Sequence, residues 1–325
     1  MQAIVLTEYG GPEVLRVSEV DDPVPGPEEV LIRVRAAGVN RADLLQREGR
    51  YPPPAPAPKV EIPGLECAGE VVAVGARVSL FKPGQRVAAL VTGGAYAEKV
   101  AVHERLAWPV PAAMTWAEAA AVPEAFLTGY DALTEQAGLM AGQWVLIHAA
   151  AGGVGSAAVQ LATWMGIHVV ATVGSAEKAA WVRGLGADHV VDYRRQKFLE
   201  VVRARTPGMD AVLDLVGQTY WDDNLQSLAP GGVLVVVGTL AGDRVEASLG
   251  MLLGRRLTVR GTALRSRPLE LRLALVQRFI RRVLPTLVEG RLKPLVDTTF
   301  PLLEAGRAHA YMRENRVYGK IVLTV

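Results

Sequence analysis

The stretch of residues 144–155, Trp-Val-Leu-Ile-His-Ala-Ala-Ala-Gly-Gly-Val-Gly, constrains the fold of this 325-residue chain more than any other. Its first part, residues 145–148, is short and apolar and lies between Gly142 and a run of small residues, which predicts a buried strand. An apolar run at helical spacing begins directly after Gly155 and predicts a helix. The stretch therefore predicts a tight turn from a strand into a helix.

The residues of this turn have the spacing of the dinucleotide fingerprint G-x-G-x-x-G. Ala150 replaces the first glycine, and Gly152 and Gly155 supply the other two. Glycine at the second place lets the backbone approach a pyrophosphate, glycine at the third lets the helix pack closely on the strand, and the helix N-terminus favours an anion. A domain of this fold that binds no dinucleotide is the alternative. We expect the cofactor to contact Ala151, Gly152, Gly153, Val154 and Gly155.

The residues that follow alternate between strand-like and helix-like patterns. Short β-rich runs are expected at residues 167–172, 188–192, 211–215 and 233–238, with helical stretches between them. This alternation is typical of a doubly wound parallel sheet, the Rossmann fold. Two histidines in these strands, His148 and His168, are expected to be structural rather than catalytic.

Composition limits the classes of function. Half of the residues are hydrophobic and 21% are charged, which is typical of a protein with a large core. The formal net charge of +2 gives no argument for binding nucleic acid or an anionic membrane. The single cysteine, Cys67, excludes intramolecular disulfides and multi-cysteine metal sites, and we expect it to be buried and inert. Without a signal-like leader or a long apolar run, the expected location is the cytoplasm.

The first 120 residues combine short strands with many Gly and Pro turns, which predicts an irregular GroES-like β-barrel. A short helix is expected at 41–46, a stiff proline-rich loop at 52–58, and a capping box of Thr115 and Glu118 at the start of a helical segment. The expected strands are residues 3–6, 15–19, 29–37, 69–74, 86–90 and 95–102.

The length of the chain favours two domains. We predict a catalytic domain over residues 1–124, a cofactor domain over 125–265, and completion of the catalytic domain by 266–325. In this tail we expect an amphipathic helix from Pro268, kinked at Pro285, then a helix at 302–312 and a closing strand at 319–325.

Six motifs match one family pattern in order and spacing over nearly the whole chain. They lie at residues 38–43, 63–75, 82–87, 94–98, 149–155 and 319–323. With these motifs the chain resembles the medium-chain dehydrogenase/reductase superfamily, specifically its zinc-free quinone oxidoreductase (zeta-crystallin-like) branch. The fold class implied is a Rossmann cofactor domain inserted in a GroES-like catalytic domain.

Differences from the zinc enzymes of this superfamily bear on the chemistry. Their two catalytic zinc ligands, a cysteine and a histidine, fall at the positions of Asn40 and Leu65, which cannot replace them. The four-cysteine structural zinc lobe is also missing. The resemblance therefore implies hydride transfer without a metal, from a reduced nicotinamide to an acceptor that is already electrophilic, such as a quinone.

The resemblance also implies roles for individual residues. Asn40 and Tyr51 would be catalytic and line the substrate pocket, with Asn40 also touching the cofactor, and Thr128 would hold its carboxamide. Asn40 is equally well explained as the N-cap of the helix at Arg41, and the two roles are compatible. For Tyr51 the alternative is a surface aromatic beside the proline-rich loop.

NADP(H) is the expected dinucleotide because Gly174 occupies the place where NAD-binding folds carry an acid. Ser175 offers a hydroxyl and Lys178 a charge to a 2′-phosphate, although Lys178 has the alternative of an ordinary solvated lysine. Tyr193 would lie near the adenosine phosphate. The remaining residues expected at the cofactor are Val216, Gly238, Thr239 and Lys320.

Three functions remain open from the sequence. The first is an NADPH-dependent quinone oxidoreductase, the second an enoyl or enone reductase, and the third a non-catalytic NADPH-binding protein. We also expect a homodimer, because the last Rossmann strand at residues 257–261 would otherwise expose its backbone edge.

Overall fold

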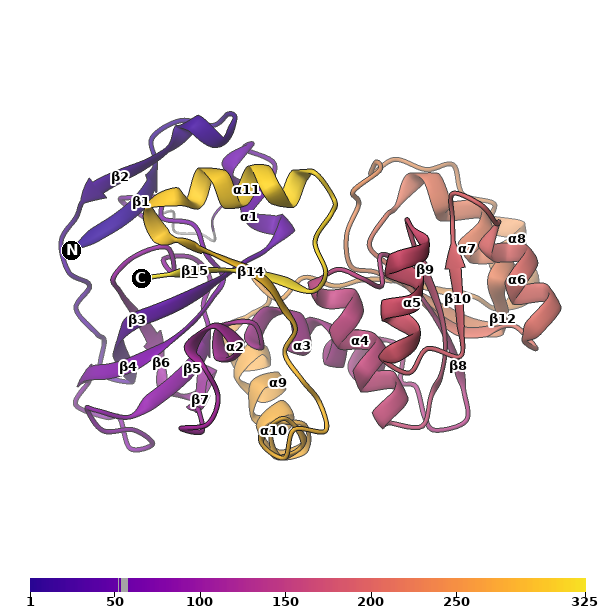
Figure 1. Ribbon diagram of the computed structural model, residues 1–325. Helices are drawn as coiled ribbons and strands as arrows, with labels where there is room; N and C mark the ends of the chain where they lie inside the picture. The colour runs from indigo at the N-terminus through magenta and orange to yellow at the C-terminus, as the bar shows by residue number, and fades with distance from the viewer. Residues whose placement is uncertain (52, 54–57) are drawn as a thin grey trace. The chain divides into compact units, whose positions relative to one another are not determined.

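The computed structural model describes residues 1–51, 53 and 58–325. Most of the predicted proline-rich loop at 52–58 therefore lies outside the described residues. The chain forms two compact units, Thr128–Leu264 and a discontinuous unit of Met1–Leu127 with Arg265–Val325 (Figure 1).

The continuous unit is built on one sheet of six parallel strands. They are β8 (Trp144–Ile147), β9 (His168–Val173), β10 (His189–Asp192), β11 (Met209–Asp214), β12 (Leu228–Val236) and β13 (Thr258–Gly261). Their order in the sheet is β10-β9-β8-β11-β12-β13, so the chain starts in the middle, moves to one edge and then returns to build the other half. This is the Rossmann strand order, and the predicted doubly wound sheet is confirmed.

Helices connect these strands on both faces of the sheet. Right-handed crossovers place α4 (Gly153–Trp164) and α5 (Ala176–Gly184) on one face. The winding direction reverses after β10, which places α6 (Phe198–Arg205) and α7 (Trp221–Ser227) on the other face, where they pack on each other. A further helix, α8 (Leu249–Arg255), precedes β13. Ligands of such sheets bind at the carboxyl ends of the strands beside this reversal.

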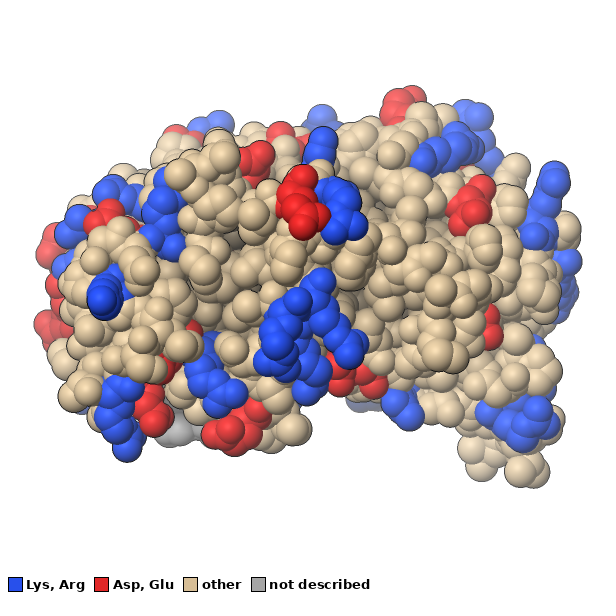
Figure 2. All heavy atoms as spheres, turned by 90° about the horizontal axis from the view of Figure 1, so that it is seen from below, with Lys and Arg blue, Asp and Glu red and all other residues tan. Residues whose placement is uncertain are grey.

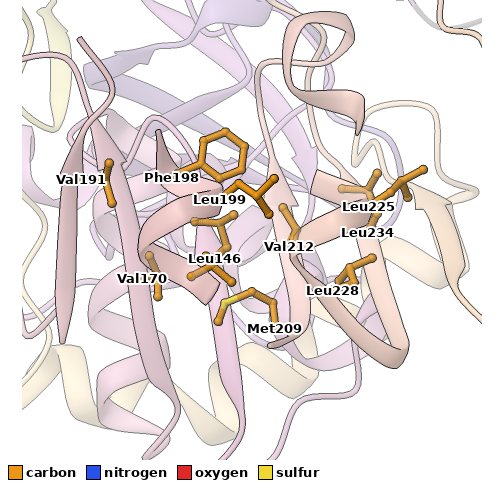
Figure 3. Close-up of a cluster of buried hydrophobic side chains, with 11 residues drawn as sticks. Leu146, Val170, Val191, Phe198, Leu199, Met209, Val212, Leu225, Leu228 and Leu234 are labelled. Carbon is orange, nitrogen blue, oxygen red and sulfur yellow. The ribbon is translucent and has the colours of Figure 1, made fainter. Parts of the chain in front are cut away.

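The core of this unit lies between the sheet and α6 and α7 (Figure 3). Leu146, Val212 and Leu234 come from three neighbouring strands and are fully buried. Phe198 of α6 and Leu225 of α7 cover them. Strands covered on both faces read as continuous apolar runs, which is why they could be recognised from the sequence.

The discontinuous unit holds a seven-stranded sheet in which six strands lie in the order β14-β15-β3-β4-β5-β7, and β6 also pairs with β3. Its strands are β3 (Glu29–Val39), β4 (Glu66–Val74), β5 (Arg86–Leu90), β6 (Lys99–His103), β7 (Ala107–Pro109), β14 (Val296–Pro301) and β15 (Lys320–Thr324). A separate hairpin joins β1 (Gln2–Leu6) to β2 (Leu15–Glu19). The tail strand β15 pairs antiparallel with β3, so the two ends of the chain share one sheet.

Two strands of this sheet were missed and one was predicted too early. β7 has only three residues and ends in proline, and β14 carries an Asp and two Thr without clear alternation, so neither shows a strong strand pattern. β6 begins at Lys99 rather than residue 95, because the backbone of Tyr96 bonds to Ile4 and Pro63 instead of β3.

The helices of this unit follow local sequence signals. They are α1 (Arg41–Arg47), α2 (Trp116–Ala120), the start of α3 (Pro123–Tyr130), α9 (Leu269–Arg282), α10 (Leu284–Val288) and α11 (Ala305–Arg313). The predicted capping box is confirmed: Glu118 N–H donates to Thr115 Oγ1 (3.2 Å), and Thr115 N–H donates to the Glu118 carboxylate (2.8 Å). The predicted break at Pro285 is also confirmed, since α9 ends and α10 begins just before it.

The exposed face of α9 is basic. Its buried side turns Leu273, Val276 and Phe279 inward, and Arg281 and Arg282 lie in its last turn. Figure 2 shows Lys and Arg side chains gathered near the middle of the face where α9 and α10 lie. The net charge of the chain is only +2, so this basic group is local. Among the described residues, no helix has the length and apolar character needed to cross a membrane.

His148 follows β8 and is fully buried with both ring nitrogens hydrogen-bonded. The Asn224 Oδ1 atom is an acceptor, so the Nε2–H of His148 donates to it (2.6 Å), and Nδ1 accepts from the Thr172 hydroxyl (2.9 Å). Burial lowers the pKa of His148 to about 4. The expected structural histidine is therefore present.

This depressed pKa predicts a loss of stability in acid. Between pH 6.5 and about 4 the unfolded chain binds a proton at His148 that the folded chain does not, so the free energy of unfolding falls as pH falls. The full contribution is about 3 kcal/mol. His148→Gln should lower stability at pH 7 but flatten this slope, as measured by urea unfolding at a series of pH values.

The matched control is His168→Gln, which changes a histidine whose side chain is 46% exposed. It should lower the free energy of unfolding at pH 7 less than His148→Gln does, because this side chain is not buried in the core. An unchanged slope in His148→Gln would contradict the assignment.

Candidate active site

The turn between β8 and α4 is closely packed. Ala149 has a left-handed backbone (φ 49°), one residue before the alanine that replaces the first fingerprint glycine. A Cβ on Gly155 would lie 2.4 Å from the Ala149 carbonyl oxygen, so only glycine fits there. Gly152 is the N-cap of α4, and the first turn of a helix leaves N–H groups without partners inside the helix. The turn has the geometry of an anion cradle.

Beside β8 in the sheet lie β11 and β12, and the loops that follow these two strands are hydrogen-bonded to each other at the same edge. The Asp214 carboxylate accepts the N–H groups of Val216 (2.7 Å) and Gly217 (3.1 Å). Gly238 N–H donates to the Asp214 carbonyl (3.2 Å), and Thr239 lies against Gly217. Three predicted cofactor residues, Val216, Gly238 and Thr239, are thereby brought together.

The carboxyl end of β9 holds the residues predicted to select the dinucleotide. A Cβ on Gly174 would lie 2.6 Å from the Tyr193 hydroxyl, so the two residues are in direct contact. Ser175 Oγ accepts the N–H of Lys178 (3.2 Å) and caps α5, and the Ser175 hydroxyl also hydrogen-bonds the Glu177 carboxylate. Glycine at 174 thus has a packing reason in addition to the missing acid. An aspartate there would have to displace Tyr193.

Thr128 is buried, being 7% exposed, and its hydroxyl has no hydrogen-bond partner among the described residues. Leaving a buried hydroxyl without a hydrogen-bond partner typically costs about 1–3 kcal/mol of stability. A ligand amide would satisfy it. The orphaned hydroxyl and the glycine-lined turn both fit a nicotinamide dinucleotide.

In the other unit, Asn40 occupies the N-cap of α1 but uses its side chain elsewhere. Its backbone N–H donates to Asp43 Oδ2 (2.8 Å), which completes one half of a cap. Its Nδ2 donates to Glu66 Oε1 (2.8 Å), and its Oδ1 accepts from Lys320 Nζ (2.6 Å). A carboxylate only accepts and an ammonium only donates, so this pair fixes which way the amide points. Asn40 therefore occupies the N-cap position without capping the helix through its side chain, and its role toward substrate and cofactor stays a prediction.

Glu66 and Lys320 form a buried ion pair, with side chains 0% and 4% exposed. The three N–H groups of Lys320 are directed to Glu66 Oε1 (2.5 Å), Asn40 Oδ1 (2.6 Å) and the Val39 carbonyl (2.9 Å). The other Glu66 oxygen accepts Glu124 N–H (2.8 Å). The predicted cofactor contact of Lys320 stays a prediction, because these bonds already occupy its ammonium.

The pair also explains a glycine near the end of β3. A Cβ on Gly38 would lie 2.2 Å from Glu66 Oε1 and 2.8 Å from the Ala120 carbonyl. The sequence analysis missed Glu66. The available signal was a carboxylate in an apolar strand next to Cys67, which is buried as expected and whose pKa burial raises to about 12.

A second network of buried hydrogen bonds contacts α1 through Asp43. Tyr96 Oη donates to Asp43 Oδ2 (3.0 Å) and lies 3.1 Å from His309 Nε2. Burial raises the pKa of Asp43 to about 6 and lowers that of His309 to about 3. Because Asp43 also holds the Asn40 backbone, this network fixes the start of the helix that Asn40 caps.

Tyr51 is partly buried rather than a free surface aromatic. The guanidinium of Arg265 lies 5.0 Å from its ring centroid, and burial raises the pKa of Tyr51 to about 12. Arg265 was not predicted, and nothing in its local sequence distinguishes it. Within the described part of the chain, no three His, Cys, Asp or Glu side chains lie close enough together to hold a metal ion.

Comparison with known proteins agrees with this geometry. The sequence matches the family models described as Alcohol dehydrogenase GroES-like domain, over residues 26–112, and Zinc-binding dehydrogenase, over residues 153–280. A quinone oxidoreductase from Pseudomonas aeruginosa is 36% identical, covering 98% of each chain.

Two solved structures extend the comparison. The quinone oxidoreductase of Escherichia coli in complex with NADPH is similar with a TM-score of 0.91 and 30% identity, covering 100% of both chains. The CurK enoyl reductase is similar with a TM-score of 0.87 and 29% identity, covering 99% of this chain and 98% of that one. The chain belongs to the medium-chain dehydrogenase/reductase superfamily, in its quinone oxidoreductase branch, as the motifs predicted.

The buried pair predicts an asymmetric response to mutation. Lys320→Met leaves the Glu66 carboxylate buried without its partner and should lower the free energy of unfolding by about 3–5 kcal/mol. Adding Glu66→Gln removes that charge, so the double variant should be more stable than Lys320→Met alone. Urea unfolding of the three proteins measures this.

The matched control is Arg291→Met, which breaks an ion pair with Glu289 whose side chains are 60% and 54% exposed. It should cost under about 1 kcal/mol. Equal losses in Lys320→Met and in the double variant would show that the ion pair has no such role.

Proposed function

We propose that this chain is an NADPH-dependent quinone oxidoreductase that transfers hydride without zinc. The observation that carries the proposal is the position of the Lys320 ammonium. It is bonded to the two side-chain oxygens, Asn40 Oδ1 and Glu66 Oε1, that a cation at this place would use. The charge at the site is therefore supplied by the protein itself, and the acceptor must already be electrophilic.

The residues of the chain have the following roles in this proposal. The turn at 151–155 and the α4 N-terminus hold the pyrophosphate, and the Thr128 hydroxyl bonds the carboxamide. When bound, NADPH supplies the hydride. Asn40, locked by its two charged neighbours, and Tyr51 orient the acceptor and exclude water.

The domain roles follow the same division. Residues 125–265 bind the cofactor, and residues 1–124 with 266–325 form the catalytic domain. The buried Glu66–Lys320 pair and the β3–β15 pairing support a catalytic domain that needs both ends of the chain.

An enoyl or enone reductase is the second candidate, supported by the similarity to the CurK enoyl reductase. Both reactions place a hydride on an electron-poor carbon next to a carbonyl, and they differ in the acceptor. A non-catalytic NADPH-binding protein is the third candidate. It would bind NADPH and turn over no acceptor.

The activity is tested by following NADPH oxidation with 1,4-benzoquinone, 1,4-naphthoquinone, an enone and an enoyl thioester. We expect turnover with quinones that EDTA leaves unchanged. Asn40→Ala should lower kcat about tenfold, the value of one lost hydrogen bond of about 1.4 kcal/mol, and Tyr51→Phe should lower it less. NADPH affinity should stay within a few-fold in both variants. Turnover of the enoyl thioester alone would favour the enoyl reductase. No turnover of any acceptor would favour the non-catalytic NADPH-binding protein.

The same assay with NADH tests the cofactor arm. NADPH should be preferred, and Lys178→Ala should weaken NADPH about tenfold because the contact is charge-assisted but partly exposed and screened by salt. NADH should be almost unaffected. Arg183→Ala removes the same charge from the far end of α5 and is the control. Equal losses for both cofactors would contradict a phosphate contact. Gly174→Asp is a poorer test, because the new side chain must also displace Tyr193.

We further propose that the ligands are small molecules and that the chain acts in the cytoplasm, away from nucleic acid and membranes. The net charge of +2 and the single buried cysteine support this proposal.

We also propose a homodimer formed through β13. This strand pairs with β12 on one side and, among the described strands, with none on the other. Exposed apolar side chains in the same part of the sequence are Leu249 (75%) and Leu253 (82%) of α8 and Val259 (38%) of β13. An unpaired edge flanked by apolar side chains favours association with a second copy.

Light scattering at micromolar concentration should give the mass of two chains. Leu253→Glu should shift the protein toward the monomer, because it places a charge in the apolar surface. A wild-type mass of one chain would contradict the dimer.

A further inference from the structure

Arg265 is a buried cation that makes no ion pair within the described residues. Its side chain belongs to the discontinuous unit and is 8% exposed. Among the described residues its hydrogen-bond acceptors are both neutral: Gln46 Oε1 at 2.9 Å and the Tyr51 carbonyl at 3.5 Å. Burial lowers the pKa of this guanidinium. Burying a guanidinium with an N–H group left unpaired is costly, so its retention calls for an explanation.

The neighbours of Arg265 hold it in one orientation. Both of its bonds use Nη1. Gln46 is itself fixed, because its Nε2 donates to Glu61 Oε1 (2.8 Å), which leaves its Oε1 facing Arg265. The ring of Tyr51 lies beside the guanidinium, 5.0 Å from ring centroid to Cζ. Arg265 is therefore pre-positioned rather than mobile.

The opposite edge of the guanidinium, formed by Nε and Nη2, is open in the sense that no described residue hydrogen-bonds to it. Nε is buried and has no hydrogen-bond partner among the described residues. The hydrogen bonds that Arg265 makes there use Nη1 and leave Nη2 unbonded. A Cβ on Gly93 would lie 3.7 Å from Nη2, an ordinary contact distance, so Gly93 is a neighbour of this edge. Nε–H and Nη2–H point the same way in a guanidinium, and this edge is the one that binds carboxylates and other oxygen anions.

The open edge lies near the rest of the candidate site. Gln46, which holds Arg265, is in the last turn of α1, and Asn40 caps the first turn of the same helix. Six residues of helix separate them by about 9 Å along the axis. Asp43, which accepts the Asn40 N–H, acts electrostatically on Arg265, as do Glu61 and Glu124. A ligand that touches Tyr51 is therefore within reach of both ends of α1.

We propose that the Nε–Nη2 edge of Arg265 binds the carbonyl oxygen of the acceptor and stabilises the oxyanion formed by hydride addition. This inference rests on the proposed function and assigns Arg265 as a catalytic residue of that reaction. A fixed guanidinium beside the oxygen stabilises the negative charge that develops there during hydride transfer.

The reaction balances as follows. The C4–H bond of the dihydronicotinamide breaks, and its electron pair goes with the hydride to the quinone. The nicotinamide is oxidised and the quinone is reduced to the hydroquinone anion, whose oxygen carries the negative charge beside Arg265. Water supplies the proton that gives the hydroquinone, because an arginine in a protein stays protonated.

Kinetics give the first test. Arg265→Gln should lower kcat/KM for 1,4-benzoquinone by about 10²-fold, as expected for one lost oxyanion donor, with NADPH affinity within a few-fold of the wild type. Arg265→Lys keeps the charge but not the two-donor edge and should recover part of the loss. The matched control is Arg272→Gln, since Arg272 on α9 also has a buried Nε without a partner. It should leave kcat/KM unchanged.

A binding measurement separates catalysis from structure. 4-Nitrophenol serves as a probe because its phenolate resembles the oxyanion and absorbs visible light. In the NADP⁺ complex the wild type should bind the phenolate, so the apparent pKa of the probe falls, and Arg265→Gln should abolish this shift. Urea unfolding of Arg265→Gln shows whether the fold survives, and Arg265→Lys serves as the second variant if it does not.

The outcomes distinguish the two proposals. If no quinone is turned over by the wild type, the proposed function fails, and the phenolate shift still tests Arg265. If the wild type turns over quinones and Arg265→Gln keeps both the rate and the phenolate shift, the role of Arg265 is overturned and the proposed function stands. If Arg272→Gln loses as much activity as Arg265→Gln, the loss comes from removing any buried cation, which also overturns it.

Discussion

The buried ion pair between Glu66 and Lys320 is the interaction on which the catalytic unit depends. The two residues are 254 positions apart and lie on β4 and β15, with β3 between them. Their charges leave water only because each is fully hydrogen-bonded, to Asn40, to Val39 and to the N–H of Glu124. The pair joins a strand that precedes the cofactor unit in the sequence to a strand that follows it. The cofactor unit, Thr128–Leu264, is therefore an insertion in the catalytic unit.

The Glu66–Lys320 pair has a role that apolar side chains at the same positions could not fill. Buried ion pairs are often no more stabilising than well-packed apolar residues, so their retention indicates a demand for position. Here the demand is the direction of one amide, because only a donor on one side and an acceptor on the other hold Asn40 in a single orientation. Arg265 follows a related principle, since one half of its guanidinium is held by neutral acceptors and the other half is open.

The sequence predicted those parts of the fold that rest on local patterns. The buried strands of the Rossmann sheet, the capping box at Thr115 and the break at Pro285 each follow from residues within one turn or strand, and the structure confirms them. It failed where the pattern was short or ambiguous, at β7 and β14. The sharp turn after β8 was expected correctly, but its left-handed residue is Ala149, because the packing of Gly155 against that carbonyl sets the geometry.

By itself, the sequence determined the fold class, the family and the position of the dinucleotide turn, since these depend on periodicity and on glycines at fixed spacing. The tertiary structure decided which polar residues share a site. Glu66, Tyr96, His309 and Arg265 acquire their partners across 26 to 254 positions, and a contact over such a distance leaves no repeating pattern in the chain. The environment that buries these groups and removes their water is a property of the folded chain alone.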